Sequence, residues 1–322
     1  MQPTASYALA AALIGFAAAA PAQQYPSKPI RLVVPLAPGG PSDILARTMA
    51  QTMSPSLGQP IVVDNRTGAG GTIGIDIVAK SPPDGHTMLL VAVATYTITA
   101  NMYAKLPYDA RRDLAPVSIL AGAPYVLTVH PSLPARTPTE LVALAKARPD
   151  QLNYGSGGVG TGPQLATELW KMKTGVQIVH IPYKGTGPAL TDLMAGHVQL
   201  GLFNMIAVLP PIQSGKLRAI AVSGPKRSPL LPNVPTITES GVAGFEDVGG
   251  HMFMVPGATP KDVIARLNRE SLKALQNPDV LARLKSEGAE VVASSPEEAA
   301  ANIRRDLGKW GEVIRAAGIK PE

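Results

Sequence analysis

Apolar and polar positions follow two different patterns along the chain. After residue 24, short runs rich in β-branched residues alternate with longer segments in which apolar residues recur every three or four positions. The short runs predict buried strands, and the longer segments predict helices with one buried face. The predicted strands are 30–36, 61–63, 87–93, 117–120, 125–130, 152–154, 177–181, 198–203 and 217–223, and the helices among them are 42–57, 72–80, 138–147, 162–173, 188–195 and 205–213. This order indicates an α/β fold with mostly parallel sheets that are flanked by helices.

The last 65 residues follow a different pattern, with helices predicted at 261–276, 278–287 and 296–317 and one short strand at 290–293. Three helix starts share one arrangement, in which a Ser or Thr is followed by Pro and, three positions after it, by an acid. Thr137, Thr259 and Ser295 are the residues at these starts. The arrangement is typical of a capped helix N-terminus with Pro in the first turn.

The length of 322 residues favours two domains. Two Gly/Pro-rich stretches, 121–124 and 247–250, are the expected boundaries. We therefore predict one lobe made of residues 23–122 and 249–322, and a second lobe made of residues 123–248. Because the chain crosses twice between the lobes, the connection is expected to act as a hinge.

The N-terminus carries an apolar run of 14 residues, 7–20, which is too short to span a bilayer. It ends in Ala20-Pro21-Ala22, which predicts a secretory signal peptide cut after Ala22. The residues before the run contain no Lys or Arg, so an uncleaved anchor and a disordered tail are the alternatives. No other stretch approaches 18 apolar residues, so we expect a mature protein that is not embedded in a membrane.

The composition limits the kinds of site and partner that the chain can have. The chain has no Cys, which excludes a disulfide scaffold, a cysteine nucleophile and Cys-ligated metal sites. The formal charge of +6 is spread along the chain without basic runs, so a nucleic-acid partner is not predicted and attraction to small anions is favoured. The 31 Gly and 32 Pro residues matter more by position than by number, because glycines gather in three loops.

Each of these three loops leads into a predicted helix. We call residues 35–43 loop A, residues 65–72 loop B and residues 154–163 loop C. Glycine lets the main chain approach a ligand closely, and the helix start that follows offers free N–H groups, so such loops suit a carboxylate or a phosphate. A tight turn without any ligand is the alternative for a single loop. Three loops at corresponding strand ends favour an anion-binding cleft.

Loop C also matches G-x-G-x-x-G, through Gly155, Gly157 and Gly160. A dinucleotide site would need an acid at the end of the next strand, and that strand ends in His180-Ile181-Pro182-Tyr183-Lys184 instead. None of the five histidines forms a recognised metal-ligand spacing, and the G-x-S-x-G motif of serine hydrolases is absent. We therefore predict no cofactor, no metal site, no catalytic residue and no enzymatic activity.

The motifs, taken in order, resemble the Bug-type family of periplasmic solute-binding receptors from tripartite tricarboxylate transporters. The resemblance covers essentially the whole mature chain and includes Tyr25-Pro26, Pro35, Gly39-Gly40, residues 43–47, Asn65-Arg66, residues 68–71, Ile73-Gly74, Pro82, residues 84–87, residues 105–109, residues 154–156, Gly158, Gly160, Glu168-Leu169, residues 182–185 and Pro188-Ala189.

This resemblance implies a two-lobed, type II periplasmic binding protein, also called a Venus flytrap. It implies a monomeric receptor that binds a small organic acid between its lobes and passes it to a membrane permease with a large and a small subunit. A receptor that reports to a sensor kinase, and an exported α/β enzyme, are the alternatives. The expected ligand-binding residues are Leu36, Pro38, Gly39, Gly40, Ser42 and Asp43 of loop A, Gly70, Gly71 and Thr72 of loop B, Ser156, Gly158, Gly160 and Thr161 of loop C, and Thr95, Lys184, Gly185, Phe203 and Asn204 elsewhere.

Three departures from the family pattern bear on the ligand. Leu36 stands where the family usually has an aromatic residue, and Gln164 stands where it often has His. Asn204 replaces a common Asp, which could meet the ammonium group of an amino acid. Because Asn cannot supply that negative charge, the sequence favours a dicarboxylate, a tricarboxylate or an aromatic acid over an amino acid.

Overall fold

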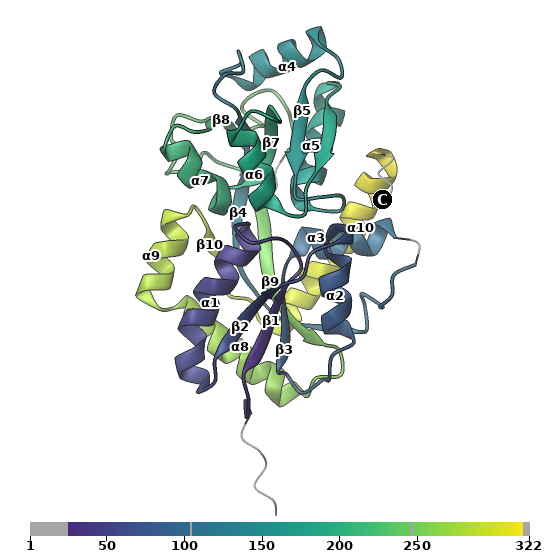
Figure 1. The fold of residues 1–322 in the computed structure, drawn as a ribbon, viewed down its shortest axis with the longest axis vertical. Coiled ribbons are helices and arrows are strands. Elements are labelled where there is room, and N and C mark those ends of the chain that lie inside the picture. The colour runs from purple at the N-terminus through teal and green to yellow at the C-terminus, as the bar shows by residue number, and fades with distance from the viewer. Residues whose placement is uncertain (1–24, 104, 246–247, 318–322) are drawn as a thin grey trace, which may run out of the picture.

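The computed structural model describes residues 25–103, 105–245 and 248–317. The predicted signal peptide, residues 1–22, lies outside these described residues. Figure 1 shows two lobes along the long axis of the molecule, joined near its centre by long strands. Within the described ranges, no helix is both long enough and apolar enough to cross a membrane.

The lower lobe in Figure 1 is built on three parallel strands. β1 (Ile30–Val34) lies between β2 (Ile61–Asn65) and β3 (Thr87–Ala92) and pairs in parallel with both. The helices of this half are α1 (Pro41–Leu57), α2 (Thr72–Ala79), α3 (Val93–Met102), α8 (Lys261–Leu275), α9 (Pro278–Ser286) and α10 (Pro296–Ala317), and a single 3-10 turn, η2 (Ala69–Gly71), precedes α2. The carboxyl ends of β1 and β2 therefore lead into loops A and B.

The upper lobe repeats this arrangement. β5 (Asn153–Ser156) lies between β6 (Val179–Pro182) and β7 (Leu200–Asn204) and pairs in parallel with both. The remaining elements are α4 (Pro138–Ala147), α5 (Gly162–Thr174), α6 (Thr186–Met194), α7 (Met205–Gln213) and β8 (Arg218–Val222). Loop C leaves the carboxyl end of β5, so loops from both lobes meet at the middle of the molecule.

Two antiparallel strands join the lobes. β4 (Leu114–Val129) pairs with β9 (Val248–Pro256) as far as Pro124 and with β7 from Tyr125 onward. β10 (Glu290–Val291) and β8 also pair with β4 in antiparallel orientation, so the sheets are mixed rather than uniformly parallel. The sequence predicts two strands, 117–120 and 125–130, with a boundary loop between them, whereas the structure has one continuous strand through that boundary. Residues 121–124 pair with His251 to Val248 of β9, and a shift of register between Ile119 and Ala121 accommodates the irregular sequence.

The helix α3 is absent from the sequence-based prediction. Its sequence, VATYTITANM, is rich in β-branched residues and shows no amphipathic pattern, because eight of its ten residues are buried. Thr97 and Thr99 donate their hydroxyl hydrogens to carbonyls of the preceding turn, at Val93 and Thr95. Tertiary packing therefore outweighs the intrinsic preference for a strand.

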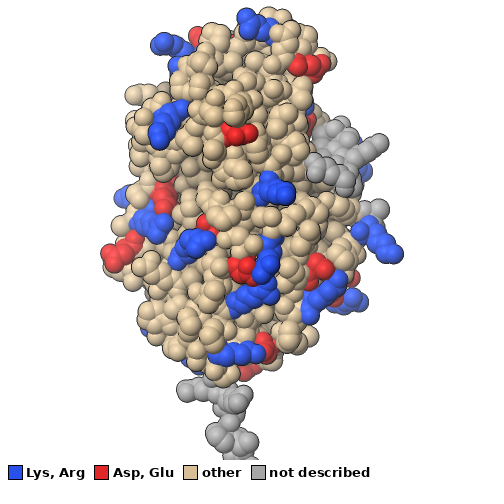
Figure 2. Space-filling view, viewed as in Figure 1, with Lys and Arg blue, Asp and Glu red and all other residues tan. Residues whose placement is uncertain are grey.

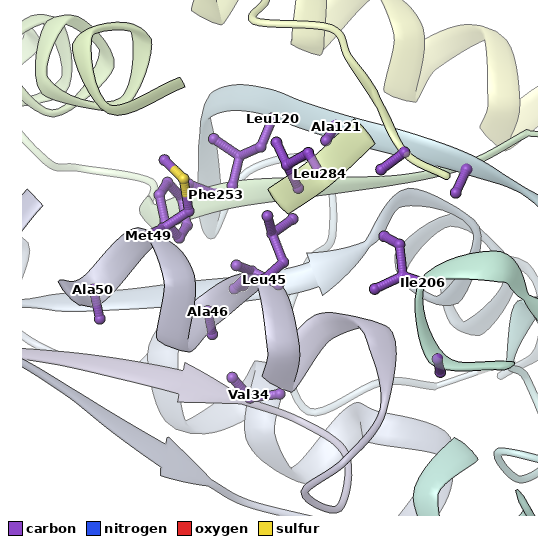
Figure 3. Packing of buried hydrophobic residues seen from close by; sticks show 14 of the residues in the cluster. Val34, Leu45, Ala46, Met49, Ala50, Leu120, Ala121, Ile206, Phe253 and Leu284 are labelled. Carbon is purple, nitrogen blue, oxygen red and sulfur yellow. The ribbon is translucent and has the colours of Figure 1, made fainter. Parts of the chain in front are cut away.

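The core follows the two-residue period of the strands. Leu32 and Val34 of β1 join the cluster packed beneath α1, α8 and α9, whereas Val33 joins the cluster beneath α2 and α10. The first cluster continues into the upper lobe through residues of α6 and α7. In Figure 3, Leu45 of α1, Leu284 of α9 and Ile206 of α7 surround one shared interior. The two lobes therefore share a continuous apolar core beside the connecting strands.

Two of the three predicted helix caps are present. The side chain of Thr137 accepts a hydrogen bond from the N–H of Glu140, and that of Ser295 accepts one from the N–H of Glu298. The prediction for Thr259 is wrong, because its hydroxyl donates to the carbonyl of Pro256 and α8 begins after Pro260 without a side-chain cap.

Candidate functional site

A cavity of about 480 Å³ lies where loops of the two lobes face each other. Its lining residues are Leu36 of loop A, Gly68, Ala69, Gly70 and Gly71 of loop B, Gly157, Gly158 and Val159 of loop C, Pro182 at the end of β6, and Tyr183, Lys184 and Pro188 after it. The position matches the crevice at the carboxyl ends of parallel strands in open α/β sheets. All three glycine loops that the sequence analysis identified thus contribute to one cavity.

Five of the expected ligand-binding residues line this cavity, namely Leu36, Gly70, Gly71, Gly158 and Lys184. The others do not line it: Pro38, Gly39, Gly40, Ser42, Asp43, Thr72, Thr95, Ser156, Gly160, Thr161, Gly185, Phe203 and Asn204. Sequence reasoning missed Pro182, Tyr183 and Pro188 as lining residues. Their signal was their place in the motif formed by residues 182–185 and Pro188-Ala189.

Several main-chain N–H groups in the wall of the cavity have no hydrogen-bond partner. Within the described part of the chain, the N–H groups of Ala69, Gly70, Gly157 and Val159 form no hydrogen bond. Lys184 is the one charged side chain among the described lining residues. Unpaired N–H groups and a cation, without a carboxylate, form an environment that suits an anion.

The two lobes touch across the cavity. The N–H of Ala37 in loop A donates to the carbonyl of Lys184 at 2.9 Å. A Cβ atom on Gly70 would lie 2.1 Å from the carbonyl oxygen of Val159, so no side chain fits between loops B and C at that point. Glycine is therefore required for this close approach of main chain to main chain.

Loop A is held by its own helix. Asp43, which is 4% exposed, accepts a hydrogen bond from the N–H of Gly39 at 3.1 Å and a forked pair of bonds from Arg47. Burial raises the pKa of the Asp43 carboxyl, but the bonds from Arg47, Gly39 and Asn65 outweigh burial and hold that pKa below its usual value. Asp43 is therefore ionised at neutral pH and fixes the loop.

The other expected residues of loop A lie close to Asp43 in the sequence. Pro38 and Gly39 are exposed, and Gly40 is the residue before the first turn of α1. Ser42, which is buried, lies in that first turn, where N–H groups lack helical partners. A direct role for these residues in ligand binding stays a prediction.

Behind loop B, two threonines support the main chain. Thr72 donates its hydroxyl hydrogen to the carbonyl of Ala69 at 2.8 Å. Thr95 of α3 is 1% exposed, and its methyl carbon would lie 3.5 Å from a Cβ on Gly71. Both residues therefore pack against the turn that presents Gly70 to the cavity.

In loop C the hydroxyl groups hold the loop itself. Ser156 is fully buried, shares a 2.6 Å hydrogen bond with Nε2 of His180, and accepts the N–H of Gly158. Thr161 donates its hydroxyl hydrogen to the carbonyl of Gly158 at 2.6 Å, and the N–H of Gly160 donates to the side-chain oxygen of Gln164 at 2.8 Å. These bonds fix the loop while the N–H groups of Gly157 and Val159 stay unpaired.

His180 gives the protein an acid-sensitive support for loop C. Burial lowers the pKa of His180 to about 4, although the Glu168 carboxylate opposes this shift. The unfolded chain therefore binds more protons than the folded chain between pH 4 and the ordinary histidine value near 6.5. Stability is fully present above about pH 6.5 and falls as the pH decreases toward 4.

We expect His180→Gln to remove part of the loss of stability at acidic pH. Urea unfolding at pH 7 and pH 4.5 should show a decrease of stability that is smaller in the variant by about 1–3 kcal/mol. His251 of β9, whose pKa burial also lowers to about 4, contributes in the same direction to both proteins and cancels in the comparison. His197→Gln, at an exposed position, is the control, and equal losses for His180→Gln and the wild type would refute the assignment.

Lys184, Gly185, Phe203 and Asn204 occupy four different settings. Lys184 is exposed at the cavity, and Gly185 is buried immediately before α6. Phe203 is fully buried in the core that both lobes share. Asn204, which is 2% exposed, donates to the carbonyl of Ala123 in β4 at 3.1 Å and to that of Gly249 in β9 at 3.4 Å. Its side-chain oxygen accepts the N–H of Ile206 at the start of α7.

Asn204 therefore braces the connecting strands, and we expect Asn204→Asp to weaken the fold. Aspartate keeps the acceptor for Ile206 but puts a carboxylate oxygen opposite two carbonyl oxygens. The free energy of unfolding should fall by about 1–3 kcal/mol, as for a buried group that loses its partners. Asn233→Asp, at an exposed position, should change stability by less than about 0.5 kcal/mol. Equal urea midpoints for the two variants would show that the hydrogen bonds of Asn204 to the connecting strands do not stabilise the fold.

The described residues contain no group of three or more His, Asp or Glu side chains suited to a metal ion. On the face shown in Figure 2, Lys and Arg are dispersed among acidic and uncharged residues rather than gathered into a stripe. The site is thus characterised by main-chain donors and a single lysine.

Comparison with known proteins identifies the family. Residues 45–319 match the family described as "Tripartite tricarboxylate transporter family receptor". Protein BugT of Bordetella pertussis is 40% identical over 310 residues, which cover 96% of this chain and 95% of BugT. A Rhodopseudomonas palustris protein solved with adipate has a TM-score of 0.89 at 36% identity, over 92% of this chain and all of that one. MatC from Rhodopseudomonas palustris, solved with bound malate, has a TM-score of 0.87 at 31% identity, over 90% of this chain and all of MatC.

These matches also settle the class of fold and of activity. A structure of the periplasmic binding protein BugD has a TM-score of 0.89, so the two lobes form the type II periplasmic binding fold. The family consists of periplasmic solute-binding receptors, not of enzymes. The chain belongs to the tripartite tricarboxylate transporter receptor family and is a Bug-type solute-binding protein.

Proposed function

We propose that this protein captures a small organic carboxylate in the cavity between its lobes and delivers it to a tripartite tricarboxylate transporter permease. The observation that carries this proposal is the set of unpaired N–H groups at Ala69, Gly70, Gly157 and Val159, with Lys184 beside them. Donors of this kind, fixed by the fold, hold a carboxylate without a buried counter-charge.

The proposed working cycle uses two lobes, residues 23–122 with 249–322 and residues 123–248. Loops A and B belong to the first lobe and loop C to the second, so a ligand held by all three loops stabilises the closed arrangement. We propose that the chain is exported by a signal peptide cut after Ala22, and that the mature receptor acts as a monomer.

The proposed ligand is a dicarboxylate, a tricarboxylate or an aromatic acid. Relatives solved with adipate and malate support an acid without an ammonium group. The bonds of Asn204 to Ala123 and Gly249 support the same choice, because that side chain is engaged with the connecting strands and carries no negative charge. Leu36, an aliphatic residue on the cavity wall, leaves room for the body of the ligand.

Calorimetry and thermal unfolding of the mature protein test the proposal. The panel is malate, adipate, citrate, benzoate, aspartate and glutamate. At least one acid without an ammonium group should bind, and at 100 times its Kd it should stabilise the protein by about 2.7 kcal/mol. Tight binding of aspartate or glutamate without any response to the other acids would refute the ligand class. No response to any acid would refute the site.

The partner is tested separately. Deletion of the permease genes should abolish uptake of the acid that binds, while leaving the affinity of the receptor unchanged. Uptake that persists, together with the loss of a transcriptional response when the receptor gene is deleted, would assign the receptor to a sensor kinase instead.

A further inference from the structure

A second cavity, of about 350 Å³, lies beside the connecting strands and shares no residue with the cavity between loops A, B and C. Its walls come from three places: Gly122 and Pro124 of β4, residues 224–230 after β8, and a segment from the end of α9 to β10 that contributes Lys285, Gly288, Ala289 and Glu290. We call it the hinge cavity. In Figure 1, α9 and β10 lie on the left of the junction, and α10 lies on its right.

The interior of the hinge cavity is apolar. Pro124, Pro225, Pro229, Leu230 and Ala289 are among its lining residues. Gly288 packs tightly beneath it, since a Cβ there would lie 2.3 Å from the sulfur of Met205 in α7. The body of a bound molecule would therefore contact hydrocarbon on several sides.

Positive charge predominates among its lining side chains. Lys226, Arg227 and Lys285 line it, against a single acid, Glu290. Arg227 is engaged, with a 2.8 Å bond to Glu239 outside the cavity. Lys226 and Lys285 are exposed and form no ion pair within the described part of the chain. Two cations near an apolar cavity fit a small molecule with an anionic group on an apolar body.

The cavity is also placed to respond to lobe movement. Residues 224–230 follow β8 of the upper lobe, whereas Lys285 and residues 288–290 lie at and after the end of α9 in the lower lobe. A rotation about the connecting strands changes the distance between these two walls. A molecule that contacts both walls thus binds best to the arrangement in which loop A already touches Lys184 of the upper lobe.

We propose that the hinge cavity binds a small apolar anion, and that this molecule and the ligand of the interlobe cavity each raise the affinity for the other. Coupling between binding sites is reciprocal, so each ligand changes the other's affinity by the same factor. The coupling rests on the proposed receptor function, whereas binding in the hinge cavity does not.

The first test uses naphthalene-2-sulfonate as the probe and its neutral sulfonamide as the matched compound, in calorimetry on the mature protein. The sulfonate should bind, and Lys226→Glu/Lys285→Glu should weaken it about tenfold while changing sulfonamide binding little. Lys146→Glu/Lys216→Glu, with the same charge change at exposed positions outside the cavity, is the control.

No sulfonate binding at millimolar concentration, or equal binding to both double variants, would overturn the proposal. Binding of a polyglutamate peptide in place of the sulfonate would assign the surface to an acidic protein segment and would also overturn it.

The second test addresses the coupling without any carboxylate. Gly187→Ala places a methyl group against loop A, and a Cβ there would lie 2.3 Å from the carbonyl oxygen of Pro38. It should weaken sulfonate binding severalfold relative to Gly308→Ala, whose Cβ meets open space. Equal sulfonate binding in these two variants would overturn the coupling. Because neither test uses a carboxylate, failure here is distinguishable from failure of the carboxylate screen.

Discussion

Gly187→Ala is expected to weaken carboxylate binding by about 5- to 150-fold without lowering the thermal stability of the unliganded protein. Gly187 lies in the first turn of α6, where alanine suits the helix better than glycine. Its Cβ would lie 2.3 Å from the carbonyl oxygen of Pro38 in loop A, on the other lobe. An overpacked contact costs about 1–3 kcal/mol, and this cost falls on the closed arrangement alone.

A matched control separates the effect of Gly187→Ala on closure of the lobes from its effect on helix propensity. Gly308→Ala makes the same substitution in α10 with nothing within 4 Å of the new Cβ, so it should bind carboxylate like the wild type. Calorimetry on both variants, with a melting curve of each unliganded protein, makes the comparison. Wild-type affinity in Gly187→Ala would show that loop A and the start of α6 need not meet for the ligand to bind.

Leu284→Ala is expected to lower the free energy of unfolding by about 2–5 kcal/mol. Leu284 of α9 is 1% exposed and packs among Leu45, Leu120 and Ala121 in the apolar core that continues into the upper lobe (Figure 3). The truncation leaves a cavity in this core, which the surrounding helices can fill only in part.

Leu281, one turn earlier on the same helix, is the matched control because it is 42% exposed. Leu281→Ala should change stability by less than about 0.5 kcal/mol, as surface substitutions usually do. Urea unfolding of both variants measures the difference. Similar midpoints for the two would mean that α9 adds little to the shared core.

The sequence predicted the loops well because glycine and proline act locally. Gly70 and Gly158 have positive φ values, which glycine accommodates and which mark turns in any fold. The starts of α4 and α10 depend on hydrogen bonds within four residues, so they too could be read from the sequence. The interlobe cavity followed from placing three such loops at the ends of parallel strands.

Other features depend on partners that are distant in the sequence. The sequence places Ser156 among the expected ligand-binding residues, and it contains no signal that the hydroxyl pairs with His180 on the next strand, 24 residues away. Asn204 looked like a ligand contact, whereas its amide reaches Ala123 and Gly249 in the connecting strands. The unbroken run of β4 through Gly122 to Pro124 depends on pairing with β9, more than 120 residues later in the chain. Local patterns contain no signal for such contacts.

The position of β9 in the sheet has a consequence for how the chain folds. β9 lies between β3 and β4, so the sheet of the lower lobe stays divided until residues 248–256 arrive. A chain that has emerged as far as residue 245 holds the whole upper lobe but leaves the edges of β3 and β4 unpaired. Such late, long-range pairing slows folding. We therefore expect the sheet of the lower lobe to be completed only when residues 248–256 join it, after the upper lobe has formed.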